Sequence, residues 1–383
     1  MNTFAVASSA PAISEEAIRQ FLTEWHQRPI FIVRLQQLGG EAQGAAALKG
    51  FGYGRPVCIS YHCDGEPKQL VLRRVRPNGF GRERPSDRVA EVWRDFHTFN
   101  DLPGHVPVAD MVALDDNGRL SSLGHATELL LLTHYAPGQP YAEDLYRLLQ
   151  GEPLRNSDTA RAQALARYLA DIHQRKHPDN VERPLLWRRR LRDLVGHGEG
   201  IMGLCDSYPL PFPSADQPII TQARLLAIET AANEWRWRLK PLSHRLCQVH
   251  GDFHPFNVLF DEGIRFSVID RSRGEWGMAE DDVSCMVINY LFFGLQQNGR
   301  FSHPFTDLYH TFWETYLANH PDPDLFSTIA PWFAWRALVL ASPKWYPTIS
   351  PTTRRQLLAF AQNVLAAPTF EYAQVERYLE IGD

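Results

Sequence analysis

Several features that mark whole classes of protein are missing from this sequence. No run of about eighteen apolar residues occurs, so no membrane-spanning helix is predicted. The five cysteines are scattered without a C-x-x-C pair, which argues against that type of zinc or redox site and favours free thiols. The first 13 residues lack a basic segment followed by an apolar one, so we expect a cytoplasmic protein. No G-x-x-x-x-G-K-S/T run is present, which disfavours a P-loop fold.

An excess of positive charge is also missing. The formal net charge is -5, so we expect neither nucleic acid nor a membrane surface as a partner. What is present is the composition of an ordinary folded protein, with 44% hydrophobic and 22% charged residues. At 383 residues the chain exceeds the size at which one core usually stops growing, and two lobes are therefore predicted.

The first third of the chain predicts a small lobe that contains both helix and sheet. Apolar residues at helical spacing over 14–26 and 87–102 predict two amphipathic helices, the first of them capped by Ser14. Runs rich in β-branched and aromatic residues, separated by glycine-rich stretches, predict an antiparallel meander over 30–35, 56–61 and 69–75. The apolar segment 127–133 predicts a buried strand.

Helices dominate the pattern after residues 135–138, whose turn residues suit a connection between lobes. Apolar residues recur with helical period over 160–174, 219–239, 281–295, 305–317, 331–340 and 353–365. Short strands are expected to interrupt them near 246–249, 258–260 and 266–269. We therefore predict an α+β fold of two lobes, a small β-rich one over 1–135 and a larger, mainly helical one over 136–383.

One stretch has the residue types that phosphoryl transfer requires. It reads H-G-D-F-H-P-F-N over 250–257 and continues into a predicted hairpin, with its turn at 261–263, that ends at Asp270. Phosphoryl transfer needs a carboxylate that orients and deprotonates the attacking hydroxyl, and oxygen ligands for the metal ions on the phosphates. Asp252 and Asn257, with four residues between them, match the spacing of the kinase catalytic loop. The competing interpretation is that this Asp and Asn only form turns and caps.

This run resembles the H-G-D-x-H-x-x-N signature of aminoglycoside phosphotransferases, choline kinases and their relatives, which share the two-lobed protein-kinase-like fold. Segment 277–283 is similar to the family's G-x-P-x-x-D-L, in which the Asp, here Asp282, supports the catalytic loop. Residues 165–173 likewise resemble the family's L-A-x-L-H helix. The resemblance implies a small-molecule kinase that moves the γ-phosphoryl group of ATP or GTP to a hydroxyl, with Asp252 as base and Mg2+ held by Asn257 and Asp270.

The resemblance extends to the N-terminal lobe. The run L-V-L-R over 70–73 resembles the strand that carries the family's phosphate-binding cation, which would be Arg73. In the helix that follows, R-D-F-H-T-F-N-D-L matches the family's R-E-Y-x-x-L-x-x-L, so Asp95 replaces the usual Glu as the partner of Arg73. Glu91, one helical turn earlier on roughly the same face, is the alternative partner.

The family also implies two backbone contacts with the nucleotide. Because glycines let backbone amides approach an anion, a flap over the phosphates is expected from Gly50, Gly52 and Gly54. An ordinary hairpin turn and a second set of glycines compete for this assignment, namely Gly39, Gly40 and Gly44. His134 and Tyr135 lie in a segment that resembles the interlobe hinge, whose backbone would bind adenine.

Departures from the family bear on the acceptor. Gly251 stands where protein kinases place the arginine that reads a phosphorylated activation loop, and no D-F-G or A-P-E follows. This favours a small-molecule hydroxyl acceptor over a protein. Arg271 and Arg273 could attract an anionic substrate, or could be solvated or ion-paired beside Glu275 and Glu280.

Two further groups near the motif have competing interpretations. His254 could act as a general base beside Asp252, but we expect it, like His250, to make structural hydrogen bonds. An aromatic cluster between 313 and 346 could line an acceptor pocket, although aromatic residues at helical spacing favour a core. A catalytically inactive nucleotide-binding scaffold and a protein kinase are the alternative functions.

Overall fold

The computed structural model describes residues 13–38, 56–209 and 220–382. The chain divides into two compact units, Met1–Thr133 and His134–Asp383, and each has a hydrophobic core of its own. The three predicted glycines of the flap, the three that compete with them and most of the proline-rich stretch 208–218 lie outside the described residues.

The first unit is built on a three-stranded antiparallel sheet. Its strands β1 (Ile30–Gln37), β2 (Val57–Cys63) and β3 (Glu66–Leu72) lie in that order, which confirms the predicted meander. Helix α1 (Glu15–His26) begins where the Ser14 hydroxyl accepts a hydrogen bond from the Ala17 amide at 3.1 Å. Its apolar side packs on the sheet, where Ile18 and Leu22 join the core.

The remaining elements of this unit follow the sheet. Helix α2 (Pro85–Thr98) continues into the short 3-10 helix η2 (Phe99–Asp101), so the predicted helix over 87–102 is present with a tighter last turn. A small hairpin of β4 (Val112–Leu114) and β5 (Leu120–Ser122) comes next.

The predicted buried strand over 127–133 is wrong. These described residues belong to no helix or strand, and the four consecutive leucines from Leu129 to Leu132 are 58% to 97% exposed. An apolar run forms a buried strand only where another strand pairs with its backbone. The residue pattern of the run does not show whether such a strand is present. Here the run is an extended connection at the end of the first unit.

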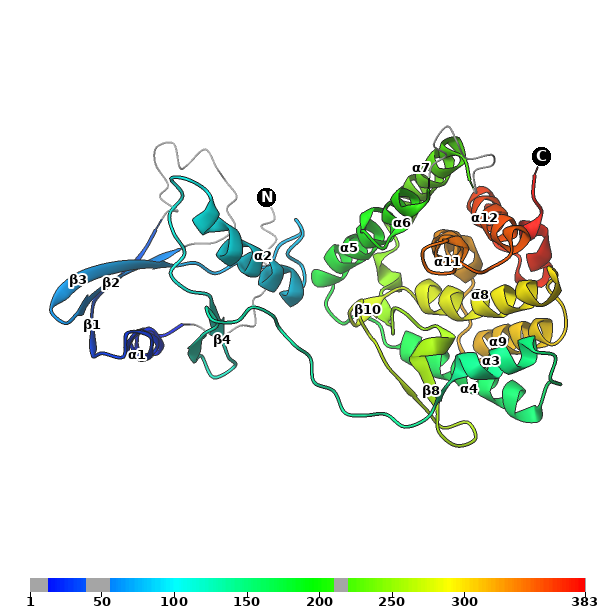
Figure 1. The fold of residues 1–383 in the computed structure, drawn as a ribbon, viewed down its shortest axis with the longest axis horizontal. Helices are drawn as coiled ribbons and strands as arrows, with labels where there is room; N and C mark the ends of the chain where they lie inside the picture. Colours follow the sequence, from blue (N-terminus) through cyan, green and yellow to red (C-terminus); the bar gives the residue numbers. More distant parts are fainter. Residues whose placement is uncertain (1–12, 39–55, 210–219, 383) are drawn as a thin grey trace. The chain divides into compact units, whose positions relative to one another are not determined.

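The second unit is mainly helical and is arranged around one helix. α8 (Ala279–Asn298) is buried on all sides from Ala279 to Leu295. It crosses the middle of the unit (Figure 1) and packs against α3 (Tyr141–Leu149), α9 (Phe305–Asn319) and α11 (Ala330–Ala341). The unit also contains α4 (Asn156–Gln174), α5 (Glu182–Gly196), α6 (Ile201–Ser207), α7 (Gln222–Leu239), α10 (Leu325–Thr328), α12 (Pro351–Ala366) and the 3-10 helices η3 (Ser243–Arg245) and η5 (Tyr372–Leu379).

Short strands in this unit hold the segment that contains the motif. β7 (Cys247–Gln248) pairs with β10 (Trp276–Gly277), and β8 (Val258–Phe260) lies between β6 (Gln139–Pro140) and β9 (Phe266–Val268). β8 and β9 form the predicted hairpin, with Val258 opposite Val268. The segment 249–257 is therefore fixed by a strand at each end.

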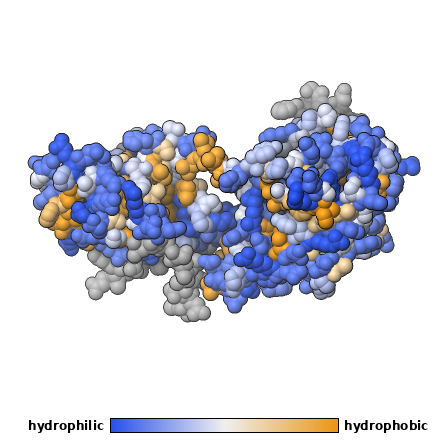
Figure 2. Space-filling model, turned by 90° about the horizontal axis from the view of Figure 1, so that it is seen from below, coloured by the Kyte–Doolittle hydropathy of each residue, from blue (hydrophilic) through white to orange (hydrophobic). Residues whose placement is uncertain are grey.

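The surface and the thiols agree with the composition. Hydrophilic residues cover most of the face in Figure 2, and hydrophobic ones show in scattered patches. None of the helices in the described part of the chain is long and apolar enough to span a membrane. All five cysteines are free, as predicted.

Candidate active site

The motif forms a loop that one buried carboxylate holds in place. Asp282, in the first turn of α8, accepts hydrogen bonds from the backbone amides of His250 and Gly251, both at 2.7 Å. The His173 ring lies 3.2 Å from the same carboxylate and 2.8 Å from the Tyr316 hydroxyl. Burial raises the pKa of Asp282, but the hydrogen bonds from His173 and the loop outweigh it and hold the pKa below its ordinary value. Asp282 thus supports the loop, as the resemblance implied.

The loop backbone needs a glycine at position 251. Gly251 has φ +89°, and a Cβ there would lie 3.1 Å from the Cβ of Arg273. The following residues turn through the short 3-10 helix η4 (Pro255–Asn257), where the His254 ring accepts a hydrogen bond from the Phe256 amide at 3.2 Å. The His250 ring accepts one from the Asp252 amide at 3.3 Å. Both histidines make structural hydrogen bonds, as expected.

The hairpin brings the two predicted metal ligands to neighbouring positions. The Ile269 amide donates to the Asn257 carbonyl at 3.0 Å, so Asp270 follows the residue that pairs with Asn257. The Asn257 side chain donates through Nδ2 to the Asp252 carbonyl at 3.1 Å, which leaves its amide oxygen as the potential ligand atom. Asp270 is exposed and has φ +59°.

These residues suit a cation that is shared with a substrate. Among the residues that the structure describes, no group of three or more His, Cys, Asp or Glu side chains is placed to hold a metal ion. Asn257 and Asp270 provide one amide and one carboxylate oxygen donor. Mg2+ is commonly bound by one or two such groups together with waters and substrate phosphates, so the donor set fits Mg2+ in a nucleotide complex.

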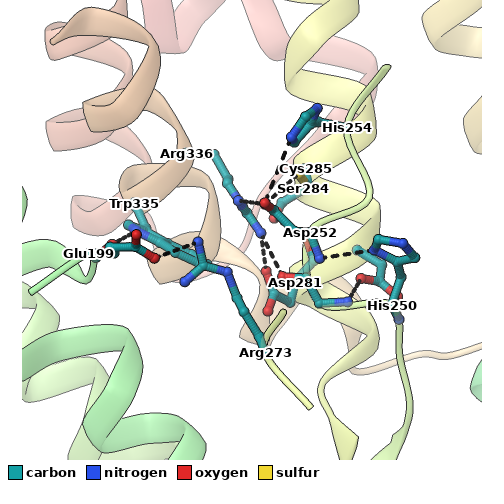
Figure 3. A network of polar contacts seen from close by, with 12 residues as sticks. Glu199, His250, Asp252, His254, Arg273, Asp281, Ser284, Cys285, Trp335 and Arg336 are labelled. Atoms are coloured by element: carbon teal, nitrogen blue, oxygen red, sulfur yellow. Dashed lines mark hydrogen bonds and ion pairs between the residues drawn. The ribbon is translucent and has the colours of Figure 1, made fainter. Parts of the chain in front are cut away.

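An arginine that the sequence analysis missed binds Asp252. Arg336 of α11 donates to Asp252 Oδ1 at 2.7 Å, to Asp281 Oδ1 at 2.7 Å and to the Gly251 carbonyl at 3.2 Å (Figure 3). Arg190 of α5 binds the other oxygen of Asp281 at 2.9 Å. Arg336 is 84 residues from Asp252 in the sequence, and no local pattern links the two.

The environment of Asp252 keeps it ionised. Burial raises its pKa, but Arg336, His254 and Arg273 outweigh burial and hold the pKa below its ordinary value. The second carboxylate oxygen, Oδ2, lies 3.7 Å from His254 Nε2. Burial lowers the pKa of His254 despite the neighbouring Asp252 carboxylate.

The two arginines after Asp270 are tied to the protein. Arg271 donates to the Val249 and Glu275 carbonyls at 2.8 to 3.1 Å. Arg273 pairs with Glu199 at 3.3 Å and stacks on Trp335 with 4.7 Å from its Cζ to the ring centroid. The ion-paired alternative therefore describes Arg273, although its partner is Glu199 and not one of the two nearby acids.

The aromatic cluster is mostly core. The side chains that are buried, with 0% to 4% exposure, are Trp313, Tyr316, Trp332, Phe333 and Trp335. Trp345, in the loop after α11, is 44% exposed, and Tyr346 packs edge-on against Phe292 with ring centroids 4.9 Å apart.

In the first unit Arg73 contacts both acids that were considered as its partner. Its Nη2 lies 2.7 Å from Asp95 Oδ2 and 3.3 Å from Glu91 Oε1, and Glu91 also pairs with Arg82. Arg73 directly follows β3, and strand alternation places it on the same face as Val71, which pairs with Cys58. The Arg73 side chain is 49% exposed, while both acids are largely buried.

The predicted hinge residues mark the start of the second unit. His134 and Tyr135 are exposed and lie outside any helix or strand. Their backbone groups precede β6, which begins at Gln139.

The two-unit α+β fold and the match of a family model define a protein of the phosphoryl-transferring class. The model of the phosphotransferase enzyme family matches residues 60–324, and the chain belongs to this family. The match includes the loop, the hairpin, Asp282 and the region of Arg73, while Arg336 lies beyond it.

Known proteins give weaker similarities. No curated protein matches the sequence. Among solved structures, a glucosamine kinase is 20% identical with a TM-score of 0.36, and the match covers 56% of each chain. An amicoumacin kinase in complex with AMP-PNP, Ca2+ and Ami is 14% identical with a TM-score of 0.38, over 94% of this chain and 97% of that one. A gentamicin complex of APH(2")-IIa is 15% identical with a TM-score of 0.33, over 93% and 97%. The assignment of the chain to the phosphotransferase enzyme family rests on the match to the family model and not on these structural similarities.

Proposed function

We propose that this phosphotransferase is an ATP-dependent small-molecule kinase in which Asp252 receives the proton of the acceptor hydroxyl. The observation that carries the proposal is the loop itself, where hydrogen bonds bring Asp252, Asn257 and Asp270 to one end of the β8–β9 hairpin. A carboxylate beside an amide and a second carboxylate is the set that phosphoryl transfer uses. GTP is the alternative donor.

The residues would divide the work as follows. Asp252 orients the hydroxyl through a hydrogen bond and takes its proton as the acceptor oxygen bonds to the γ-phosphorus. The bond between that phosphorus and the leaving diphosphate oxygen breaks in the same step. Asn257 and Asp270 would hold Mg2+, which neutralises phosphate charge when bound.

Arg73 is proposed to bind the nucleotide phosphates. An arginine stays charged at working pH and can donate two parallel hydrogen bonds to phosphate oxygens. Asp95 and Glu91 fix its position, and Arg82 offsets part of their negative charge. The exposed Val71 on the same face gives an apolar contact for the base, and the backbone of His134 and Tyr135 is proposed to bind adenine. Residues 1–135 would thus form the nucleotide-binding lobe, and 136–383 would carry the catalytic loop and acceptor site.

The test is a screen for nucleoside diphosphate release with Mg2+ and ATP or GTP across alcohols, sugars and amino alcohols. Asp252→Ala is expected to lower kcat about 10²- to 10⁴-fold on the acceptor found, because the proton acceptor is lost. Asp261→Asn, in the turn of the same hairpin, is the matched control and should retain activity.

An Asp252→Ala protein with wild-type kcat would contradict the proposal. Thermal stabilisation by nucleotide without transfer to any acceptor would instead favour an inactive scaffold. Label that appears in protein acceptors and never in small molecules would favour a protein kinase.

A further inference from the structure

The Asp252 carboxylate is anchored at one of its two oxygens. Arg336 Nη1 lies 2.7 Å from Oδ1, and the His254 ring nitrogen Nε2 lies 3.7 Å from Oδ2. A charge-assisted hydrogen bond of this length fixes the carboxylate rotamer strongly. Figure 3 shows Arg336 reaching between Asp252 and Asp281 from α11.

The arginine is itself fixed. Its side chain is 7% exposed, and its second nitrogen, Nη2, binds both Asp281 Oδ1 and the Gly251 carbonyl. The planar guanidinium has no freedom to rotate while these contacts hold. Trp335 covers it, with 4.0 Å from the Arg336 Cζ to the ring centroid.

Support of Asp281 alone does not account for this placement. Arg190 already pairs with Asp281 through its Oδ2, at 2.9 Å, and its other nitrogen donates to the Arg273 carbonyl at 2.6 Å. Arg336 binds the other oxygen of Asp281 through Nη2, whereas its Nη1 is directed to Asp252 and not to Asp281. The second arginine adds a contact to the residue proposed to take the substrate proton.

We propose that Arg336 is a positioning residue for phosphoryl transfer, holding Asp252 Oδ1 so that Oδ2 is the oxygen that meets the acceptor hydroxyl. This inference rests on the proposed function. Arg336 contacts neither metal ligand in the described structure and would act only through Asp252 and the Gly251 carbonyl. Its loss therefore lowers turnover and leaves nucleotide binding intact.

Two buried arginines that share Asp281 give a matched pair for the test. Arg336→Gln and Arg190→Gln each remove one contact to Asp281, but only the first releases Asp252. The probe is MgATP alone, because slow transfer to water needs no identified acceptor. We expect Arg336→Gln to lower kcat for ADP release about 100-fold, with KM for MgATP within about threefold of wild type. Arg190→Gln should lose stability and keep kcat within about threefold.

Equal losses of kcat in the two variants would overturn the inference, because Arg336 would then act only as support for Asp281. If Arg336→Gln does not fold, Arg336→Lys keeps the charge but has no planar fork to serve both carboxylates. Wild-type kcat in Arg336→Lys would equally contradict the proposal, and about a tenfold loss at unchanged KM would support it.

A crystal structure separates this inference from the proposed function. Asp252 in the Arg336→Gln protein should take a different rotamer, or several, while Asp282 still holds the loop. An unchanged Asp252 rotamer in the Arg336→Gln protein would contradict the positioning role, whatever kcat that variant has. A wild-type protein without ADP release from MgATP alone or with any acceptor would instead contradict the proposed function.

Discussion

Asp282 shows how much one side chain contributes to the site. It is fully buried and accepts two hydrogen bonds from loop amides that would otherwise be buried without partners. A carboxylate in the first turn of a helix is also stabilised by the helix dipole. The loop conformation therefore depends on a charge that lies outside the loop.

Asp282→Asn is predicted to destabilise the protein by about 3 kcal/mol, because an amide cannot accept three hydrogen bonds at the same two positions. Denaturant unfolding of both proteins measures the difference. Asp261→Asn is the control, since its partner Arg265 is 67% exposed and surface ion pairs contribute less than about 1 kcal/mol. Equal stability of Asp282→Asn and wild type would show that the loop does not need this carboxylate.

At the scale of elements, the loop is fixed between two strand pairs and the start of α8. Its turn uses a backbone conformation that only glycine adopts at low cost, at Gly251. The same loop carries the side chains proposed to act in catalysis, so strain in its backbone moves them directly.

Gly251→Ala is predicted to cost about 1–2 kcal/mol of stability through its positive φ and to lower kcat by at least about tenfold as the loop shifts. Gly263→Ala is the matched variant, because Gly263 also has a positive φ, +58°, but nothing lies within 4 Å of its added Cβ. A comparable loss of stability with unchanged kcat is expected there. If both variants keep full activity, the loop tolerates the displacement.

Local sequence patterns predicted the elements whose signal lies in their own residues. The meander, the β8–β9 hairpin and helices such as α4, α8 and α12 follow from apolar spacing. Helix α5 was not predicted, because its five arginines from Arg183 to Arg192 obscure the apolar spacing. The prediction of a strand over 127–133 was wrong for a related reason. A strand needs a second strand to pair with, and the pattern of its own residues carries no information about that second strand.

The same distinction applies to the site. The motif indicated Asp252, Asn257 and Asp270 together, because loop and hairpin are contiguous in sequence. Arg336 could not be found, since its approach to Asp252 depends on how α11 packs against α8. The pairing of Arg73 was open for a similar reason, and the structure shows contacts to both Asp95 and Glu91.

At the scale of the whole molecule, each of the two units has a core of its own, and the family match extends over parts of both. The proposed phosphate cation lies in the first unit, whereas the proposed base and metal ligands lie in the second. A ligand that binds the folded protein and not the unfolded chain raises its stability, so nucleotide binding is expected to be measurable in unfolding experiments.

MgATP at about 100 times its Kd is predicted to stabilise the folded protein by about 2.7 kcal/mol. Chelation of Mg2+ with EDTA, and separately Asp270→Asn, should each remove most of this gain, because the phosphates then lose their metal contact. Thermal unfolding with and without nucleotide measures the effect, and Asp261→Asn should behave like wild type. Equal stabilisation in EDTA would contradict the assignment of Asp270.

The first turn of α8 holds two different parts of the site. Asp282 binds the backbone of the loop, and its neighbour Asp281 binds Arg336, which in turn holds the Asp252 side chain. The backbone of the loop and the side chain of Asp252 are thus both linked to the first turn of α8, the side chain by way of Arg336. Because Arg336 itself belongs to α11, a shift of α11 relative to α8 is expected to turn the Asp252 carboxylate while Asp282 still holds the loop backbone.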